Sequence, residues 1–164
     1  MPKVAVLMGS KSDFSIVQPA VESLKRFKID YEIRVISAHR TPELAREFSL
    51  SARENGFEVI LCAAGKAAHL GGVVAAYTTL PVIAIPVLSS AFSGLDSLLS
   101  TVQMPSGVPV ATVAINGAEN AAILAAQILS IKYPEIQKML SAYKDEMRDK
   151  VVNDDILLNK ELNN

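Results

Sequence analysis

Short apolar runs alternate along the chain with longer segments in which apolar residues recur every three or four positions. The runs are typical of buried β-strands, and the longer segments are typical of amphipathic helices. The predicted strands cover residues 4–8, 31–37, 58–64, 81–87 and 109–115. We expect Pro86 to end the fourth strand, because proline has no N–H to donate to a neighbouring strand.

Helical segments lie between these strands and after the last of them. They cover residues 14–27, the stretch from Thr41 to Gly56, residues 67–79 and residues 118–132. The second helix has clear boundaries, because Thr41 is a favourable N-cap, Pro42 suits a first turn and Gly56 follows the last turn. Pro19 removes a hydrogen bond from the first helix, so we expect a kink there.

This order of elements predicts the fold class. Strands that are apolar throughout, each separated from the next by a helix, indicate a parallel sheet covered on both faces. We therefore expect an α/β fold, a doubly wound parallel sheet in three layers. With 164 residues in all, the chain is long enough for one core, and we expect a single α/β catalytic domain over residues 1–132.

The tail over residues 133–164 is charged and favours a helix. Its residues Ile136, Leu140, Tyr143 and Met147 recur at helical spacing. Two interpretations remain open: an amphipathic helix that lies on its own domain, or an arm that packs on a neighbouring subunit. The helix at 118–132 is apolar on nearly all sides and must be buried somewhere, which favours the arm and an oligomer.

Composition and charge indicate which kinds of partner and which cellular compartment to expect. The net charge is −1, so neither a nucleic acid nor an anionic membrane surface is an expected partner. Cys62 is the only cysteine, which excludes an internal disulfide framework and fits a reducing compartment. The first residues lack the layout of a signal peptide, and no apolar run approaches the ~20 residues that span a bilayer. We expect a cytoplasmic location.

Polar and glycine-rich loops follow the first three predicted strands. They are "GSKSD" at 9–13, "SAHRTP" at 37–42 and "AAGKAAHLGG" at 63–72. In doubly wound sheets, ligands bind in the crevice beyond the carboxyl ends of the strands, at the point where the strand order reverses. These three loops are therefore the expected binding site.

The first two loops offer groups for a phosphorylated ligand. The serines and backbone N–H groups of 9–13 can cradle a phosphate, and Asp13 can accept hydrogen bonds from sugar hydroxyls, although Ser12 or Asp13 could instead cap the helix. Arg40 has a planar fork that suits phosphate oxygens. Histidine is the side chain suited to proton transfer near neutral pH, so His39 is the candidate acid or base.

The third loop is small and rich in exposed backbone, so its N–H and C=O groups can approach a planar ligand closely. His69 is interpreted as support for this loop, and Lys66 as a solvated lysine or an anion contact. Neither a phosphate-binding G-x-x-x-x-G-K-[ST] loop, a G-x-G-x-x-G fingerprint nor a G-x-S-x-G elbow occurs. The two histidines and one cysteine are not spaced as metal ligands, so no metal is expected.

Together with "VQMPSGVPVATVAI" at 102–115, these loops resemble the phosphoribosylaminoimidazole carboxylase catalytic-subunit family of purine biosynthesis. Within that family they are similar to the 5-(carboxyamino)imidazole ribonucleotide mutase branch. The resemblance extends from about Lys3 to Ile131. It implies a flavodoxin-like fold, a homo-octamer and a reaction without cofactor, in which a carboxylate moves from the exocyclic nitrogen to carbon 4 of the imidazole.

The resemblance also implies roles for individual residues. His39 matches the general acid and base, and Ser10, Asp13 and Arg40 match ligand-binding positions. Ser12 and Ser37 would assist at the phosphate. The residues of the loop that encloses the ring and the carboxylate are Ala64, Gly65, Ala67 and Leu70. Lys66 and Gly71 depart from the family, which often has glycine and proline there.

Two alternatives remain at this stage. The sister carboxylase branch uses the uncarboxylated aminoimidazole ribonucleotide and free carbon dioxide. A flavodoxin-like module that senses a ribonucleotide without catalysis would need the same binding groups but no turnover, so the effect of His39 on turnover distinguishes it.

Overall fold

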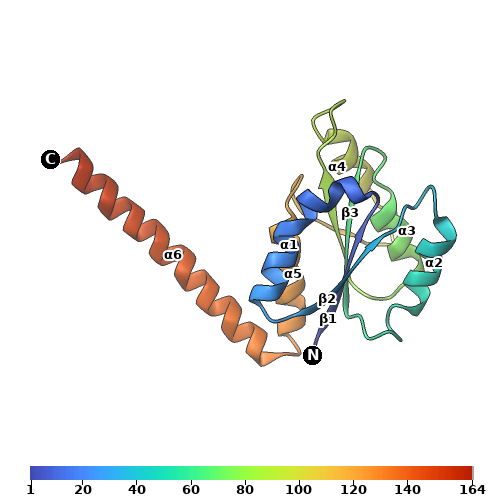
Figure 1. The fold of residues 1–164 in the computed structure, drawn as a ribbon, viewed down its shortest axis with the longest axis horizontal. Helices are drawn as coiled ribbons and strands as arrows, with labels where there is room; N and C mark the ends of the chain where they lie inside the picture. The colour runs from blue at the N-terminus through green and yellow to red at the C-terminus, as the bar shows by residue number, and fades with distance from the viewer. Residues whose placement is uncertain (164) are drawn as a thin grey trace.

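The computed structural model describes residues 1–163 as a five-stranded sheet with helices on both faces (Figure 1). Its strands are β1 (Lys3–Met8), β2 (Asp30–Val35), β3 (Val59–Gly65), β4 (Val82–Val87) and β5 (Ala111–Thr112). Its helices are η1 (Lys11–Asp13, a 3₁₀ turn), α1 (Phe14–Arg26), α2 (Pro42–Ser51), α3 (Leu70–Tyr77), α4 (Leu95–Val102), α5 (Ala118–Ser130) and α6 (Pro134–Leu162).

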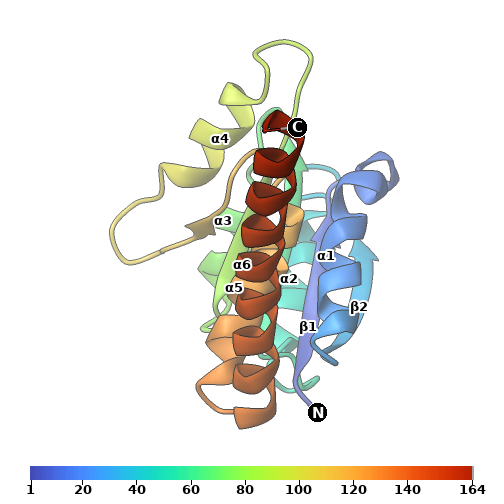
Figure 2. The same ribbon diagram turned by 90° about the vertical axis from the view of Figure 1, so that its left-hand side faces the viewer.

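The strands are all parallel and lie in the order β2-β1-β3-β4-β5. Helices α1 and α5 cover one face of the sheet, and α2 and α3 cover the other (Figure 1). Figure 2 shows β2 and α4 on opposite sides of the molecule. The predicted doubly wound, three-layer fold is confirmed. Because β1 pairs with both β2 and β3, the strand order reverses there and opens a crevice at the carboxyl ends.

Alternate side chains of β1 supply two separate cores. Val4, Val6 and Met8 pack with α1 and α5, whereas Ala5 and Leu7 pack with α2 and α3. Successive side chains of a strand point to opposite faces, so a strand that is apolar throughout is buried on both sides. This double burial fixes the ends of the central strands, and the loops that follow them, in place.

Several elements differ from the sequence prediction. β2 is an edge strand that is partly exposed, and β5 contains only Ala111 and Thr112. Pro86 lies inside β4 rather than at its end. It is tolerated because β5 pairs only with Ile83 and Ala84, which leaves no strand beside Pro86 on that side. Helix α1 continues through Pro19, and α4 was not predicted.

Helix α6 leaves the domain after its first turns (Figure 1). Ile136 and Leu140 are buried, and Tyr143 contacts Phe27 edge to face at 5.8 Å between ring centroids. From Met147 onwards the side chains of α6 are exposed. Within residues 1–163, no helix is both long and apolar enough to cross a membrane. The division into a domain and a separate extension stays a prediction.

Candidate active site

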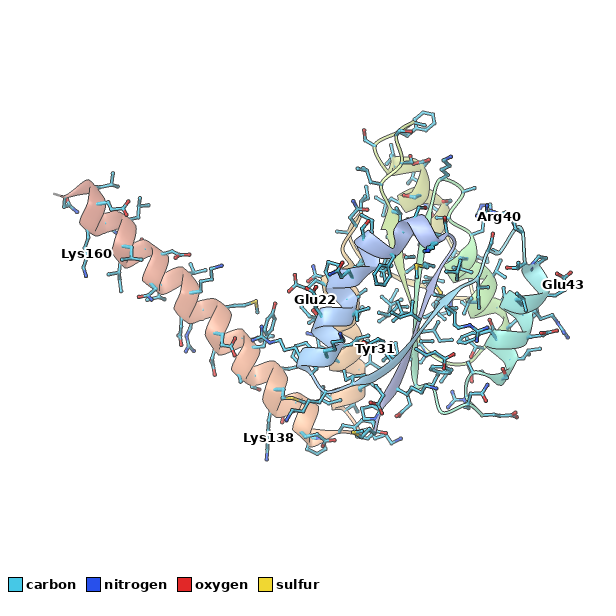
Figure 3. The ribbon with its side chains drawn as sticks, in the orientation of Figure 1. Glu22, Tyr31, Arg40, Glu43, Lys138 and Lys160 are labelled. Carbon is cyan, nitrogen blue, oxygen red and sulfur yellow. The ribbon has the colours of Figure 1, made fainter. Side chains whose placement is uncertain are left out.

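A cavity of about 750 Å³ lies at the carboxyl ends of β1 to β4. The three predicted loops meet there. The lining includes every candidate residue from the sequence: Ser10, Ser12, Asp13, Ser37, His39, Arg40, Ala64, Gly65, Lys66, Ala67, His69 and Leu70. Figure 3 shows Arg40 at this end of the sheet, remote from Lys138 and Lys160 on α6. The sequence thus located the cavity, whereas the roles of these residues stay predictions.

The loop after β1 is organised by its own hydroxyls. The Ser12 N–H and hydroxyl both donate to the Ser10 hydroxyl oxygen, at 3.3 and 2.8 Å. Partial burial raises the pKa of Asp13, while hydrogen bonds from Ser12 and Ser10 act in the opposite direction. Asp13 is therefore a carboxylate held at an energetic cost, with oxygen atoms available to a ligand that can donate hydrogen bonds.

The loop after β2 is closed by Thr41. The Thr41 hydroxyl donates to the Ser37 carbonyl and accepts from the Ser37 N–H, both at 3.0 Å. Thr41 occupies the N-cap position of α2, but its side chain makes no capping bond to that helix. The predicted N-cap position is therefore confirmed, while the hydroxyl is used to close the loop that holds His39 and Arg40.

Arg40 joins the first two loops. Its guanidinium donates to the Gly9 carbonyl at 3.2 Å, and its backbone N–H donates to the Ser37 hydroxyl at 3.2 Å. One guanidinium nitrogen of Arg40 is thus bonded to the protein, and the residue remains exposed. Since a guanidinium has five N–H donors, others remain for an anion in the cavity.

The two histidines of the chain meet across the cavity. His39 Nε2 lies 2.8 Å from His69 Nδ1, and the rings are nearly perpendicular, at 81°. This hydrogen bond requires one of the two nitrogens to carry a proton and the other to offer its lone pair. The pair can hold one extra proton and keep the bond, but two extra protons would break it. His69 therefore orients His39 as well as lying in the third loop.

The loop after β3 is held by α4. The Ser100 hydroxyl accepts from the Ala68 N–H at 3.0 Å, and its single proton is shared between the Asp96 carbonyl of α4, at 2.8 Å, and the Lys66 carbonyl, at 3.2 Å. Lys66 has a φ of 56°, a left-handed conformation that is uncommon for a lysine. Gly71 lies in the first turn of α3, where it is buried against Ala84. The presence of glycine at position 71 therefore affects the packing of α3 on the sheet and not the length of the loop.

Sequence reasoning missed one side of the cavity. Val87, Leu88, Ser89 and Ser90, which end β4 and follow it, also line the space. Ser89 is buried and donates to the Asp96 carboxylate at 2.7 Å. The signal was available, because the rule that places ligands beyond strand ends applies to this strand as well.

Other groups carry less chemistry. Cys62 is buried in the core, and burial raises the pKa of its thiol well above the ordinary range. Residues 1–163 contain no cluster of three or more histidine, cysteine, aspartate or glutamate side chains placed to hold a metal ion. The histidine pair and the hydroxyl-rich loops are therefore the chemistry that the cavity offers.

A family model described as AIR carboxylase matches residues 3–150. The chain belongs to the AIR carboxylase family. It is 58% identical over 148 residues to the N5-carboxyaminoimidazole ribonucleotide mutase of Pyrococcus abyssi, which covers 90% of this chain and 85% of the relative. It is 57% identical over 152 residues to the protein of the same description from Thermotoga maritima, with coverage of 93% and 89%.

Solved structures of the family agree with the fold. A crystal structure of Treponema denticola PurE superposes with a TM-score of 0.87 at 34% identity, and covers 96% of this chain and 99% of that one. The resemblance seen in the sequence motifs is confirmed at the level of family and fold, including the flavodoxin-like arrangement of the sheet.

Proposed function

We propose that this protein is an N5-carboxyaminoimidazole ribonucleotide mutase, an isomerase of purine biosynthesis. The observation that carries the proposal is the 2.8 Å contact between His39 and His69 inside a cavity that three hydroxyl- and glycine-rich loops surround. Relatives that are 57% and 58% identical to the chain over the aligned residues carry this description. They do not favour the sister carboxylase or the sensing module.

The binding roles follow from the chemistry of each loop. Arg40, Ser12 and Ser37 offer a cation and two hydroxyls for the phosphate of the ribonucleotide. Asp13 accepts hydrogen bonds from the ribose, with Ser10 beside it. The small loop at residues 64–70 packs against the imidazole ring and its carboxylate.

His39 moves one proton in the proposed reaction. In its protonated form it donates that proton to the exocyclic nitrogen as the C–N bond to the carboxylate breaks, which leaves an amine and carbon dioxide. Carbon 4 of the ring then attacks the carbon dioxide and forms a C–C bond. Neutral His39 removes the proton from carbon 4, so the ring regains its aromaticity and His39 returns to its starting form. Proton transfer of this kind contributes about 10²- to 10⁴-fold in rate.

Carbon dioxide has to stay beside the ring between the two steps. Ala64, Gly65 and Ala67 present small surfaces with few polar side-chain groups, which suit a neutral, weakly polar molecule. Because escape would waste the intermediate, holding the reactants in position contributes as much as the acid–base group does. This scheme uses only residues of the chain and requires no cofactor.

We also propose that the protein acts as a homo-octamer in the cytoplasm. The apolar stripe of α6 continues past the domain through Val151, Leu158 and Leu162, all of which are exposed. Helix α4 carries a second exposed stripe of Leu95, Leu99 and Val102. Exposed apolar stripes of this size are typical of contacts between subunits.

A turnover assay tests the proposed function. Purified protein is incubated with N5-carboxyaminoimidazole ribonucleotide, without added bicarbonate, and the carbon-carboxylated product is separated and quantified. The proposal predicts catalytic turnover. Binding without turnover would instead indicate the sensing module, and turnover only of the aminoimidazole ribonucleotide with bicarbonate would indicate the sister carboxylase.

A further inference from the structure

Lys66 has an unusual backbone conformation at the edge of the cavity. Within residues 1–163, the non-glycine residues with positive φ are Lys28, Lys66, Ser93 and Asn116. Of these, Lys66 alone lines the cavity. A left-handed conformation costs conformational free energy in any residue with a Cβ, and such strain gathers at ligand sites.

The side chain of Lys66 has no structural task in its loop. The loop is fixed by α4 through backbone groups: Ser100 bonds to the Lys66 carbonyl and the Ala68 N–H, and Thr101 donates to the Ala68 carbonyl at 3.3 Å. In the part of the chain that the structure describes, no hydrogen bond or ion pair of the Lys66 ammonium is recorded, and the residue is exposed. The ammonium is thus available to a ligand.

The two cationic side chains that line the cavity lie on different sides of it. Arg40 belongs to the side formed by β1 and β2, where it bonds to the Gly9 carbonyl among the serine hydroxyls. Lys66 belongs to the side formed by β3 and α4, in the same tight loop as His69. A ligand with two separated anionic groups could therefore pair with both cations, its phosphate at Arg40 and its second anion beside the histidine pair.

We propose that Lys66 strengthens the preference of this chain for the carboxylated ribonucleotide by binding its carboxylate, an inference that rests on the function proposed above. An ammonium is a compact charge on a flexible stem, so it can reach the carboxylate both on the nitrogen of the substrate and on carbon 4 of the product. Because substrate and product both carry this group, Lys66 strengthens binding of both and contributes little to the chemical step.

This role predicts that replacing Lys66 weakens the binding of the ligand without slowing turnover. Replacing Lys66 with a neutral residue raises KM for the carboxylated ribonucleotide and does not lower kcat, because the charge that Lys66 binds is lost when neutral carbon dioxide forms. Lys66→Asn and Lys66→Gly are suitable variants, because asparagine and glycine both tolerate the left-handed conformation. Lys66→Arg keeps the charge and should retain most of the affinity.

The decisive experiment compares two ligands by calorimetry: the carbon-carboxylated aminoimidazole ribonucleotide and the uncarboxylated aminoimidazole ribonucleotide. We expect both neutral variants to bind the carboxylated ligand about 5- to 30-fold more weakly, as for one charge-assisted contact in a partly open site. Their affinity for the uncarboxylated ligand should not change. The difference in affinity for the carboxylated ligand between the wild type and the neutral variants should shrink at about 0.5 M salt, because exposed charges are screened.

Two control variants sharpen the comparison. Lys25→Ala removes an exposed lysine of α1 that does not line the cavity, and should leave both affinities unchanged. Arg40→Lys should weaken both ligands alike, because they share the phosphate.

Equal weakening of both ligands by the Lys66 variants would overturn the inference, since Lys66 would then bind the phosphate. Unchanged affinity for the carboxylated ligand would overturn it too. In both cases wild-type turnover would persist and the proposed function would stand. If the wild type binds neither ribonucleotide, the proposed function itself fails, and the inference with it.

Discussion

At the scale of single residues, His39 is the group on which the proposed chemistry depends. We expect His39→Asn to bind the ribonucleotide with nearly unchanged affinity and to lower turnover by at least about 10²-fold, the lower end for loss of an acid–base group. Steady-state kinetics and calorimetry on the same preparation measure the two quantities. His69→Gln is the matched comparison and should cost less, because His69 acts through His39. Near-normal turnover of the asparagine variant would remove His39 from the mechanism.

The charge of Asp13 should lower the stability of the free protein and strengthen the binding of the ligand. Burial raises its pKa, so the folded chain binds this proton more tightly than the unfolded chain does. The Asp13 contribution to stability is therefore greatest below the ordinary carboxyl pKa and is lost as the pH rises through the raised value. Asp13→Asn should stabilise the free protein slightly at neutral pH, and the gain should vanish near about pH 4.

The same variant should bind the ribonucleotide more weakly, because an amide is a poorer acceptor for ribose hydroxyls. Thermal unfolding across a pH series and a ligand titration measure the two effects. A variant that is less stable than the wild type at neutral pH would show that Ser12 supports the carboxylate more than burial penalises it.

The sequence predicted most of the residues that line the cavity, but it did not predict the contacts between their side chains. Local motifs placed Ser10, Arg40 and His39 in loops at strand ends, and the fold brings such loops together. The approach of His69 to His39 depends on how two loops 30 residues apart meet, which no local pattern encodes. The Thr41 hydroxyl had two possible partners, and only the folded loop decides between them.

At the scale of elements, Glu58 joins the start of β3 to the corner between α5 and α6. The Tyr133 hydroxyl donates to its carboxylate at 2.6 Å, and the Lys132 ammonium donates at 3.0 Å. Burial disfavours the charge of Glu58, but these two donors outweigh it and hold its pKa below the ordinary value. Its contribution to stability is therefore present above the ordinary pKa and is lost as the pH falls through the lowered value.

Glu58→Gln should lower the free energy of unfolding at neutral pH by about 1 kcal/mol, a reduced figure because Lys132 is largely exposed. The difference from the wild type should close below about pH 4. Urea unfolding at neutral and acidic pH measures both. Glu54→Gln, an exposed glutamate in the preceding turn, is the control and should have no effect. A difference that persists at acidic pH would indicate lost packing rather than a lost charge.

Elements buried on both faces were the most predictable part of the fold. β1 after Lys3 and the whole of β3 are apolar because they lie between two helical layers, and the sequence shows this directly. β2 and β5 are edge strands, where one neighbour is missing and apolar patterning does not set the length. Helix α4 escaped prediction because most of its apolar side chains are exposed rather than packed on the sheet.

At the scale of the whole molecule, α6 is the element whose side chains are exposed in the single chain from Met147 onwards. We expect Leu158→Asp to shift the assembly from octamer towards smaller species, because a charge would be buried at the subunit contact. Light scattering coupled to size-exclusion chromatography measures the mass. Asn153→Asp places the same charge on the opposite side of the helix and should leave the mass unchanged. A monomeric wild type at micromolar concentration would contradict the proposed assembly.

The central claim is that one enzyme-bound molecule passes its carboxylate from nitrogen to carbon, and a single-turnover isotope experiment tests it most directly. Excess protein is mixed with N5-carboxyaminoimidazole ribonucleotide in solution that contains labelled bicarbonate and carbonic anhydrase. The account predicts carbon-carboxylated product that carries almost no label, because the small loop at residues 64–70 retains the carbon dioxide. Product labelled to the level of the solution would contradict it, because the carboxylate would then have come from free carbon dioxide.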